Sequence, residues 1–334
     1  MKRITMADVA EYAGVSKSTI SQYLNGRFDY MSEETRVKIA QAVKDLNYRP
    51  NMVARSLKQK SSTTIGVIVA NILHVFSTQV IRAIEDFCHQ KGFHVIVCNA
   101  DDQPEKEKKY IEMLKAKQVD GIIAFPTGDN VDLYQQLLDE GYPLVFMDRI
   151  VKELKVDTII LDNQEAARLA AEALIQGDYQ HIAMVSPPLI EQVTPRVERV
   201  NAFQEFVQQT DAEAPRVSLI AGRIHTIYEK LDAFFQNEAH PDAIFAINDR
   251  VLHEVLSFFS RNNIRIPDDV AVINVDDVSF ADFYNPPLTT ISQPAFEMGK
   301  KAAEILFANM LKGKTDKHAE ILRFKPILVR RKSC

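Results

Sequence analysis

The chain lacks the features that mark membrane, secreted and disulfide-rich proteins. Its 334 residues contain no apolar run near the roughly 18–20 residues needed to cross a bilayer. The N-terminus meets Asp8 and Glu11 early and has no apolar signal-peptide core, so we expect a cytoplasmic protein without a membrane partner. The three cysteines include no Cys-x-x-Cys pair, which predicts neither a disulfide framework nor a zinc site.

Sequence signatures of catalysis are also missing. There is no glycine-rich phosphate loop, no Gly-x-Ser-x-Gly and no His-x-x-x-His among the eight histidines. We therefore expect no enzyme activity, no metal and no cofactor.

Length and charge divide the chain. At 334 residues it is too long for one ordinary core, which predicts two or three domains. Residues 1–60 hold 11 Lys/Arg and 6 Asp/Glu, a balance of +5, whereas the rest holds 29 and 39, a balance of −10. A small basic head on an acidic body suggests a polyanionic partner for the head alone. Chance surface composition is the alternative.

The first helices of the head form a helix-turn-helix pattern. Thr5 is a plausible cap for a helix that stops at Gly14, because glycine takes the left-handed turn conformation most easily. Ser16 suits the cap of a second helix that ends at Asn25-Gly26. Its inward positions are Ile20, Tyr23 and Leu24.

A third helix is predicted from Ser32, with Val37, Ala40, Val43 and Leu46 on its inner face. The result is a compact three-helix unit. A second helix with small polar outward residues fits the major groove of B-DNA, and its hydroxyls suit phosphate oxygens or base edges. A plain three-helix bundle with a polar face is the alternative.

From residue 65 the pattern changes to apolar strands alternating with amphipathic helices. Such alternation predicts doubly wound parallel sheets built from βαβ units, and we divide them into two lobes near Asp162. The predicted segments are a helical head (1–50), a short helical candidate with a polar linker (51–61) and an α/β domain (62–334). The expected lobes are about 62–161 with 290–321, and about 162–289 with 322–334.

Several motifs together resemble the LacI/GalR family of bacterial transcriptional regulators. They are DVAEYAGVSKSTISQYLN, LNYRPN, IGVIV at 65–69, FAINDRV at 245–251, VINVDD at 272–277 and PPLTTISQP at 286–294. The similarity covers essentially the whole chain. It implies a dimeric repressor with a helix-turn-helix DNA-binding head (1–50), a hinge helix and linker (51–61) and a two-lobed effector-binding and dimerisation domain (62–334) like the periplasmic sugar-binding proteins. A sugar-modifying enzyme and a sugar-binding receptor of the same α/β architecture are the alternatives, and turnover of a bound sugar would favour the enzyme.

The resemblance also implies how the head and hinge meet DNA. In the family the hinge becomes helical on operator DNA, and Leu57 aligns with a leucine that wedges into the minor groove; packing the two hinges together is the alternative role. The family usually has Arg where this chain has Gln22, and Gln favours adenine where Arg favours guanine. The predicted DNA contacts are Thr5, Ser16, Lys17, Ser18, Thr19, Ser21, Gln22, Asn25, Arg49, Asn51, Ala54 and Leu57.

An effector pocket is expected beyond the carboxyl ends of the strands, where ligands of doubly wound sheets bind. The resemblance places ligand contacts on most of the polar residues found there, and Arg196 lies three residues from Arg199. The predicted effector contacts are Asn71, His74, Phe76, Asp148, Arg149, Arg196, Arg199, Asn248, Asp276 and Gln293.

Several polar residues around the expected pocket also have a structural alternative. Asp162 and Asp249 follow strands and suit helix caps, His74 suits a loop surface, and Arg196 suits an ordinary ion pair. Three arginines favour an anionic ligand, a sugar acid or sugar phosphate, of which we favour a sugar acid. We expect a homodimer on a pseudo-palindromic operator; the operator, the ligand and the sign of regulation stay open.

Overall fold

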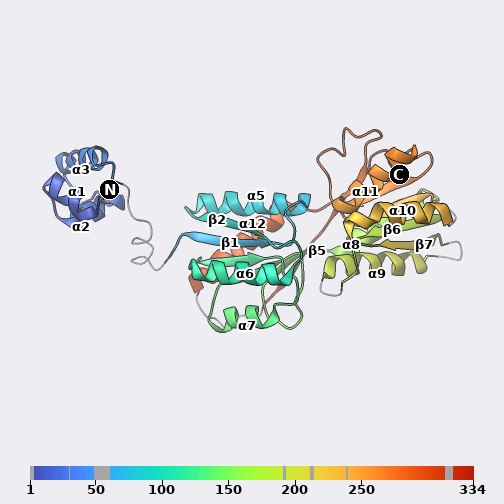
Figure 1. Cartoon of the computed structure of the whole chain (residues 1–334), viewed down its shortest axis with the longest axis horizontal. Coiled ribbons are helices and arrows are strands. Elements are labelled where there is room, and N and C mark those ends of the chain that lie inside the picture. Colours follow the sequence, from blue (N-terminus) through green and yellow to red (C-terminus); the bar gives the residue numbers. More distant parts are fainter. Residues whose placement is uncertain are drawn as a thin grey trace. The chain divides into compact units, whose positions relative to one another are not determined.

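The chain forms two compact units, residues 1–62 and 63–334. The computed structural model describes residues 4–29, 31–48, 61–190, 193–210, 214–237, 240–312 and 319–334. The first unit is helical and the second contains two six-stranded sheets (Figure 1). In the described ranges, every helix is too short or too polar to cross a membrane. The DNA contacts predicted at Arg49, Asn51, Ala54 and Leu57 lie outside these ranges.

The head contains the three predicted helices, which are α1 (Met6–Ala13), α2 (Lys17–Leu24) and α3 (Glu33–Asp45). Thr5 and Asp8 form a capping box, in which each side chain accepts the other's backbone N–H. Gly14 ends α1 with a left-handed φ of 67° and so makes the turn between the helices. Ser16 caps α2 by accepting the N–H of Thr19. These helix ends are as predicted.

The inner face of α3 differs from the prediction. Val37 is 60% exposed and Ala40 is also exposed, whereas Ile39 and Ala42 are fully buried. The core of the head consists of Val9, Ala10, Ile20, Ile39, Ala42 and Tyr48, with Val43 and Leu46 packed against it. The predicted inner face is therefore rotated about the helix axis relative to the buried face, which is centred on Ile39 and Ala42. Only the packing of α3 against α1 and α2 selects between these faces.

The first lobe is a sheet between two helical layers. Helices α5 and α12 lie on one side of the sheet and α6 and α7 on the other (Figure 1). The first pair shares a core with β1, and the second pair shares the core on the other face. The strand order is β11-β5-β4-β3-β1-β2, and all pairs are parallel. The elements are β1 (Thr64–Val69), α5 (Val75–Gln90), β2 (His94–Asn99), α6 (Pro104–Ala116), β3 (Gly121–Ala124), α7 (Val131–Asp139), β4 (Leu144–Met147), β5 (Thr158–Leu161), α12 (Ala295–Lys312) and β11 (Ile321–Phe324).

The second lobe repeats this plan. Its strand order, β12-β10-β9-β8-β6-β7, matches the first sheet position by position, with α8 and α9 on one face and α10 and α11 on the other. Only β12 among the described strands is antiparallel. The elements are α8 (Asn163–Gln176), β6 (His181–Ser186), α9 (Thr194–Gln208), β7 (Arg216–Ala221), α10 (Ile224–Asn237), β8 (Ala243–Ala246), α11 (Asp249–Asn262), β9 (Ala271–Val275), β10 (Thr289–Ser292) and β12 (Ile327–Val329).

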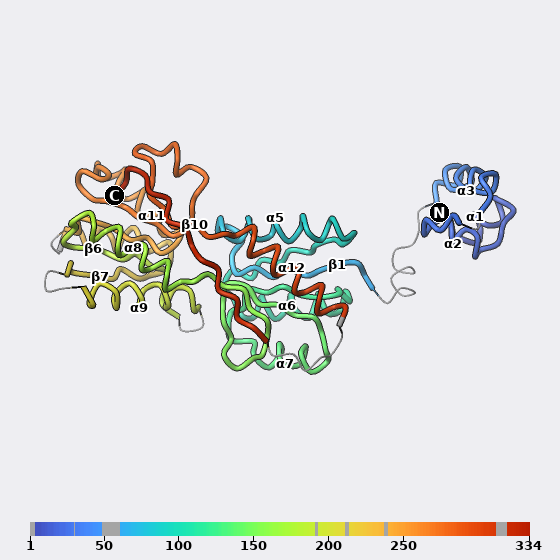
Figure 2. The backbone as a smooth tube through the Cα atoms, turned by 180° about the vertical axis from the view of Figure 1, so that it is seen from behind, coloured from blue at the N-terminus to red at the C-terminus, as the bar shows by residue number. Residues whose placement is uncertain are grey.

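The chain crosses between the lobes (Figure 2), and two of these crossings lie at other residues than the expected boundaries at 290 and 321. The prediction returned the chain to the first lobe at 290, but β10 pairs with β9 and Ile291 is buried in the second-lobe core. The return is made by α12, which packs on α5 so closely that a Cβ on Gly299 would lie 2.7 Å from the Val80 carbonyl oxygen. At the other end, β11 pairs with β5 and so belongs to the first lobe.

The stability of the head should depend on residue 39 and be insensitive to residue 37. We expect Ile39→Ala to lower the opening free energy of the head by about 2–4 kcal/mol, because it leaves a cavity in a six-residue core. Val37→Ala, at an exposed position, should change it by less than about 0.5 kcal/mol. Hydrogen exchange of amides in residues 6–45 of the full chain measures both. Equal effects of the two substitutions would contradict this placement of α3.

Candidate functional site

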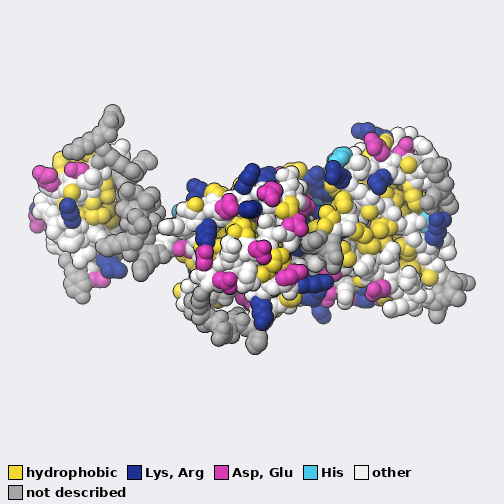
Figure 3. Space-filling view, turned by 60° about the horizontal axis from the view of Figure 1, so that its bottom comes forward, with side chains coloured by type: hydrophobic (Ala, Val, Ile, Leu, Met, Phe, Trp, Pro, Cys, Tyr) yellow, Lys and Arg dark blue, Asp and Glu magenta, His cyan; other side chains and the backbone are white. Residues whose placement is uncertain are grey.

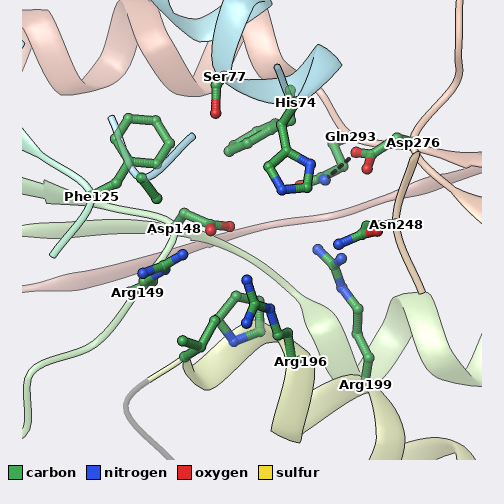
Figure 4. Close-up of a pocket in the computed structure, with 14 residues that line it drawn as sticks. His74, Ser77, Phe125, Asp148, Arg149, Arg196, Arg199, Asn248, Asp276 and Gln293 are labelled. Carbon is green, nitrogen blue, oxygen red and sulfur yellow. Dashed lines mark hydrogen bonds between the residues drawn. The ribbon is translucent and has the colours of Figure 1, made fainter. Parts of the chain in front are cut away.

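A pocket at the carboxyl ends of the strands has walls from both lobes (Figure 4), and its empty space of about 470 Å³ includes space open to solvent. Of the ten predicted effector contacts, nine line it. The lining residues are Ala70, His74, Phe76, Ser77, Phe125, Asp148, Arg149, Val193, Pro195, Arg196, Arg199, Asn248, Asp276 and Gln293.

Asp148 and Asp276 occupy equivalent positions in the two lobes. Asp148 follows β4, the third strand counted from β11, and Asp276 follows β9, the third strand counted from β12. Each has a left-handed φ, 69° and 87°, and each donates its N–H to the next strand, to Ile159 O at 2.7 Å and Ile291 O at 3.0 Å. Such a backbone is costly for a residue with a Cβ and is concentrated at functional sites. The turn places both carboxylates on the pocket wall.

Three arginines point into the pocket from the side opposite Ser77 and His74 (Figure 4). Arg149 follows β4, whereas Arg196 and Arg199 lie in the first turns of α9. Arg199 is 5% exposed; its Nε donates to Asn163 Oδ1 at 2.9 Å and its Nη1 to Ile247 O at 2.8 Å. These two bonds fix the plane of its guanidinium group.

His74 joins the lobes and is not a free surface residue, which corrects that alternative. Its Nδ1 lies 2.5 Å from Asp249 Oδ1, and the Val75 N–H donates to Asp249 Oδ2 at 2.8 Å. Asp249 therefore does not cap α11; Asn248 does, by accepting the Val251 N–H at 3.0 Å. The hydrogen bond from His74 lowers the pKa of Asp249, although burial acts in the opposite direction.

Asp276 is the most buried carboxyl of the pocket. The Gln293 Nε2 donates to its Oδ1 at 2.5 Å and the Asp249 N–H to its Oδ2 at 3.2 Å. Burial, and then repulsion by Asp249, raise the pKa of Asp276 to about 6. The Gln293 Oε1 is buried and has no hydrogen-bond partner among the described residues, so it can accept a ligand hydroxyl.

The pocket lining lacks one predicted residue and contains others that the prediction did not include. Asn71 does not line the pocket, because its Oδ1 accepts the Leu73 N–H at 2.9 Å and so stabilises its own turn. Ser77 and Phe125 were missed. Phe125 directly follows β3, so its position after a strand was the signal that could have identified it. Asp162 caps α8, as the structural alternative proposed.

The outer surface of α2 is the candidate nucleic-acid interface of the head. Lys17, Ser18 and Gln22 are exposed, and Thr19 and Ser21 are half-buried. Other predicted contacts already serve helix ends, since the Asn25 Nδ2 donates to Ser21 O at 2.7 Å and Thr5 and Ser16 are N-caps. No group of described residues has the composition of a metal site.

A helix-turn-helix head joined to a two-lobed unit with a polar pocket defines the class of ligand-responsive DNA-binding regulators. Residues 5–51 match the family model described as bacterial regulatory proteins, lacI family, and residues 171–334 match a periplasmic binding protein-like domain. The chain belongs to the LacI family of bacterial transcriptional regulators.

Relatives and solved structures agree along the whole chain. It is 46% identical to the probable HTH-type transcriptional regulator EndR of Paenibacillus polymyxa, over 98% of each chain. It is 35% identical to the HTH-type transcriptional regulator KdgR of Bacillus subtilis, over 90% of this chain and 89% of that one. The Lac repressor dimer bound to operator and the anti-inducer ONPF is 26% identical, with a TM-score of 0.84 over 99% of each chain. These are regulators, which decides against the enzyme alternative.

The raised pKa of Asp276 predicts a pH-dependent stability. The folded protein binds this proton more tightly than the unfolded chain, whose Asp pKa is about 3.9. The free energy of unfolding therefore loses a contribution as pH rises from 5 to 7, and Asp276→Asn removes that loss. The stability of the variant relative to the wild type should rise by about 1 kcal/mol over this range.

Urea unfolding at pH 5 and pH 7 measures this difference. The matched control is Asp269→Asn, because Arg265 holds the pKa of that exposed carboxyl at about 2, so it stays ionised throughout. A difference between wild type and Asp276→Asn that does not change with pH would show that Asp276 titrates normally.

Proposed function

We propose that this protein is a cytoplasmic homodimeric repressor whose affinity for a pseudo-palindromic operator is set by a small sugar-derived acid. The observation that carries the proposal is the convergence of nine predicted contacts, drawn from both lobes, on one cavity. A ligand that touches both lobes binds one relative lobe arrangement better than another, and only such differential affinity can shift a conformational equilibrium. The shift changes the spacing of the two heads and so the fit to two half-sites.

The head supports the DNA part of this proposal. Its basic balance and the exposed Lys17, Ser18 and Gln22 on α2 suit a phosphate backbone and base edges. Figure 3 shows Lys/Arg and Asp/Glu side chains interspersed over the visible face of the first lobe, so that face carries no continuous basic patch. The Lac repressor, a structural relative, is seen as a dimer on its operator. We extend that assembly to this chain.

The pocket supports a polyhydroxylated ligand with an acidic group. Carboxylate and amide oxygens of Asp148, Asn248 and Gln293 suit sugar hydroxyls, which both donate and accept. Guanidinium groups pair with carboxylate in a fixed planar geometry. Arg199 is held in that orientation by two hydrogen bonds and faces the cavity, so we assign it the ligand's carboxylate.

Base preference should respond to residue 22. We expect Gln22→Arg to shift the preferred base at one position of each half-site from adenine toward guanine, by about 1–3 kcal/mol. The control is Gln41→Arg, which adds the same charge on an exposed position of α3. Binding to a randomised operator library measures both. An unchanged preference in Gln22→Arg would remove Gln22 from base readout.

Ligand charge should decide affinity. Titration calorimetry with gluconate, galacturonate and a keto-deoxy-gluconate, beside glucose and galactose, should show binding of an acid and not of the neutral sugars. Arg199→Gln should weaken that binding about 10–100-fold, the worth of a charged hydrogen bond. Arg323→Gln is the matched control, since Arg323 pairs with Glu198 and does not line the pocket. Binding of neutral sugars alone would refute the anionic ligand.

A further inference from the structure

Asp102 connects two pocket arginines that come from different lobes. Its Oδ1 accepts from Arg149 Nη2 at 2.5 Å and its Oδ2 from Arg196 Nη2 at 2.9 Å. The arginine side chains are 5% and 11% exposed, and that of Asp102 is 30% exposed. Asp102 itself does not line the pocket. It therefore supplies the negative charge of this ion triad from behind the pocket wall.

The backbone holds Asp102 in this position. Asp101 and Asp102 both have left-handed φ values, 53° and 54°, and the Asp102 N–H donates to Ala70 O at 2.9 Å. Two consecutive non-glycine residues in this region are costly and persist where their surroundings fix them. Only the second carboxylate reaches the arginines, because the Asp101 carboxylate pairs with Lys106 at 2.5 Å.

Besides Asp102, each of the two arginines also donates to a backbone carbonyl. Arg149 Nη1 donates to Pro126 O at 3.2 Å and Arg196 Nη1 to Pro188 O at 3.4 Å, a long bond. Arg149 Nε is buried and has no partner among the described residues. Both guanidinium groups line the cavity. A ligand anion at these donors would share its arginines with a second carboxylate, and the two like charges would repel each other.

We propose that Asp102 is a specificity-determining residue, an internal anion that occupies Arg149 and Arg196 and thereby limits the affinity of the pocket for anionic effectors. The inference rests on the proposed function, because it concerns the charged group of that effector. A carboxylate bound to a guanidinium satisfies its charge and its hydrogen bonds together, so removing it leaves a site that another small carboxylate can fill.

The test compares Asp102→Gly with Asp101→Gly in the full-length protein, with acetate as the probe. Glycine suits the left-handed backbone at both positions, so the pair differs in the carboxylate that is lost. Asp102→Gly should lower the thermal midpoint of the effector-binding unit by about 5 °C relative to Asp101→Gly. Acetate should restore most of this loss, whereas sodium chloride at equal ionic strength should not, and neither salt should distinguish Asp101→Gly from wild type.

Two outcomes would overturn the proposal: equal midpoints for the two variants, or a loss in Asp102→Gly that acetate and chloride restore equally. If Asp102→Gly does not fold, Asp102→Ala also vacates the carboxylate position, and it takes the same acetate test beside Asp101→Ala, whose left-handed backbone is equivalent. A second measurement is gluconate affinity, which should rise about tenfold in Asp102→Gly. If none of the three sugar acids binds any variant while acetate rescue is intact, the proposed effector is contradicted and the role of Asp102 stands.

Discussion

Charged groups taken out of water must be neutralised or hydrogen-bonded nearby, and this constraint shapes the pocket. A buried ion without a partner costs several kcal/mol, so ion pairs hold several of the charges, whereas Arg199 is held by the neutral acceptors Asn163 Oδ1 and Ile247 O. Asp102 neutralises Arg149 and Arg196, and Asp249 pairs with His74. In both cases one partner comes from each lobe. The ion pairs that neutralise these charges therefore also link the two lobes. A charged ligand that competes for the same partners would change the strength of these links.

The repeated sheet plan explains why the pocket groups converge. Parallel strands place all their carboxyl ends at one edge, and two sheets with the same strand order present equivalent edges to each other. Asp148 and Asp276 show the consequence, because equivalent strand ends and equivalent left-handed turns bring two carboxylates to the same cavity. Their environments differ: burial and Asp249 raise the pKa of Asp276.

In the head, folding and recognition use neighbouring residues of the same chemical type. Ser16 accepts the N–H of Thr19, and its Oγ also lies 2.6 Å from Ser18 Oγ and 2.8 Å from Thr19 Oγ1. Hydroxyls thus satisfy the open end of α2. The backbone carbonyl of Gln22, one turn further along, accepts N–H groups at the C-terminal end of α2, whereas its exposed side chain is the one we propose for base readout. Spacing alone does not separate these roles.

The sequence by itself determined the helix ends of the head, the strands, the parallel sheets and most of the pocket wall. Those features follow from local chemistry: caps, β-branched runs and polar residues directly after strands. Tertiary structure alone decided that α3 buries Ile39 and not Val37, and that β10 stays in the second lobe.

The tertiary structure also decided that the Asn71 side chain hydrogen-bonds within its own turn, whereas Asp102 accepts hydrogen bonds from two arginines. The reason is physical: these outcomes depend on which surfaces meet across long stretches of chain, from Asp102 to Arg196 for example. Periodicity and spacing carry no information about such pairings until the sheets and helices are packed.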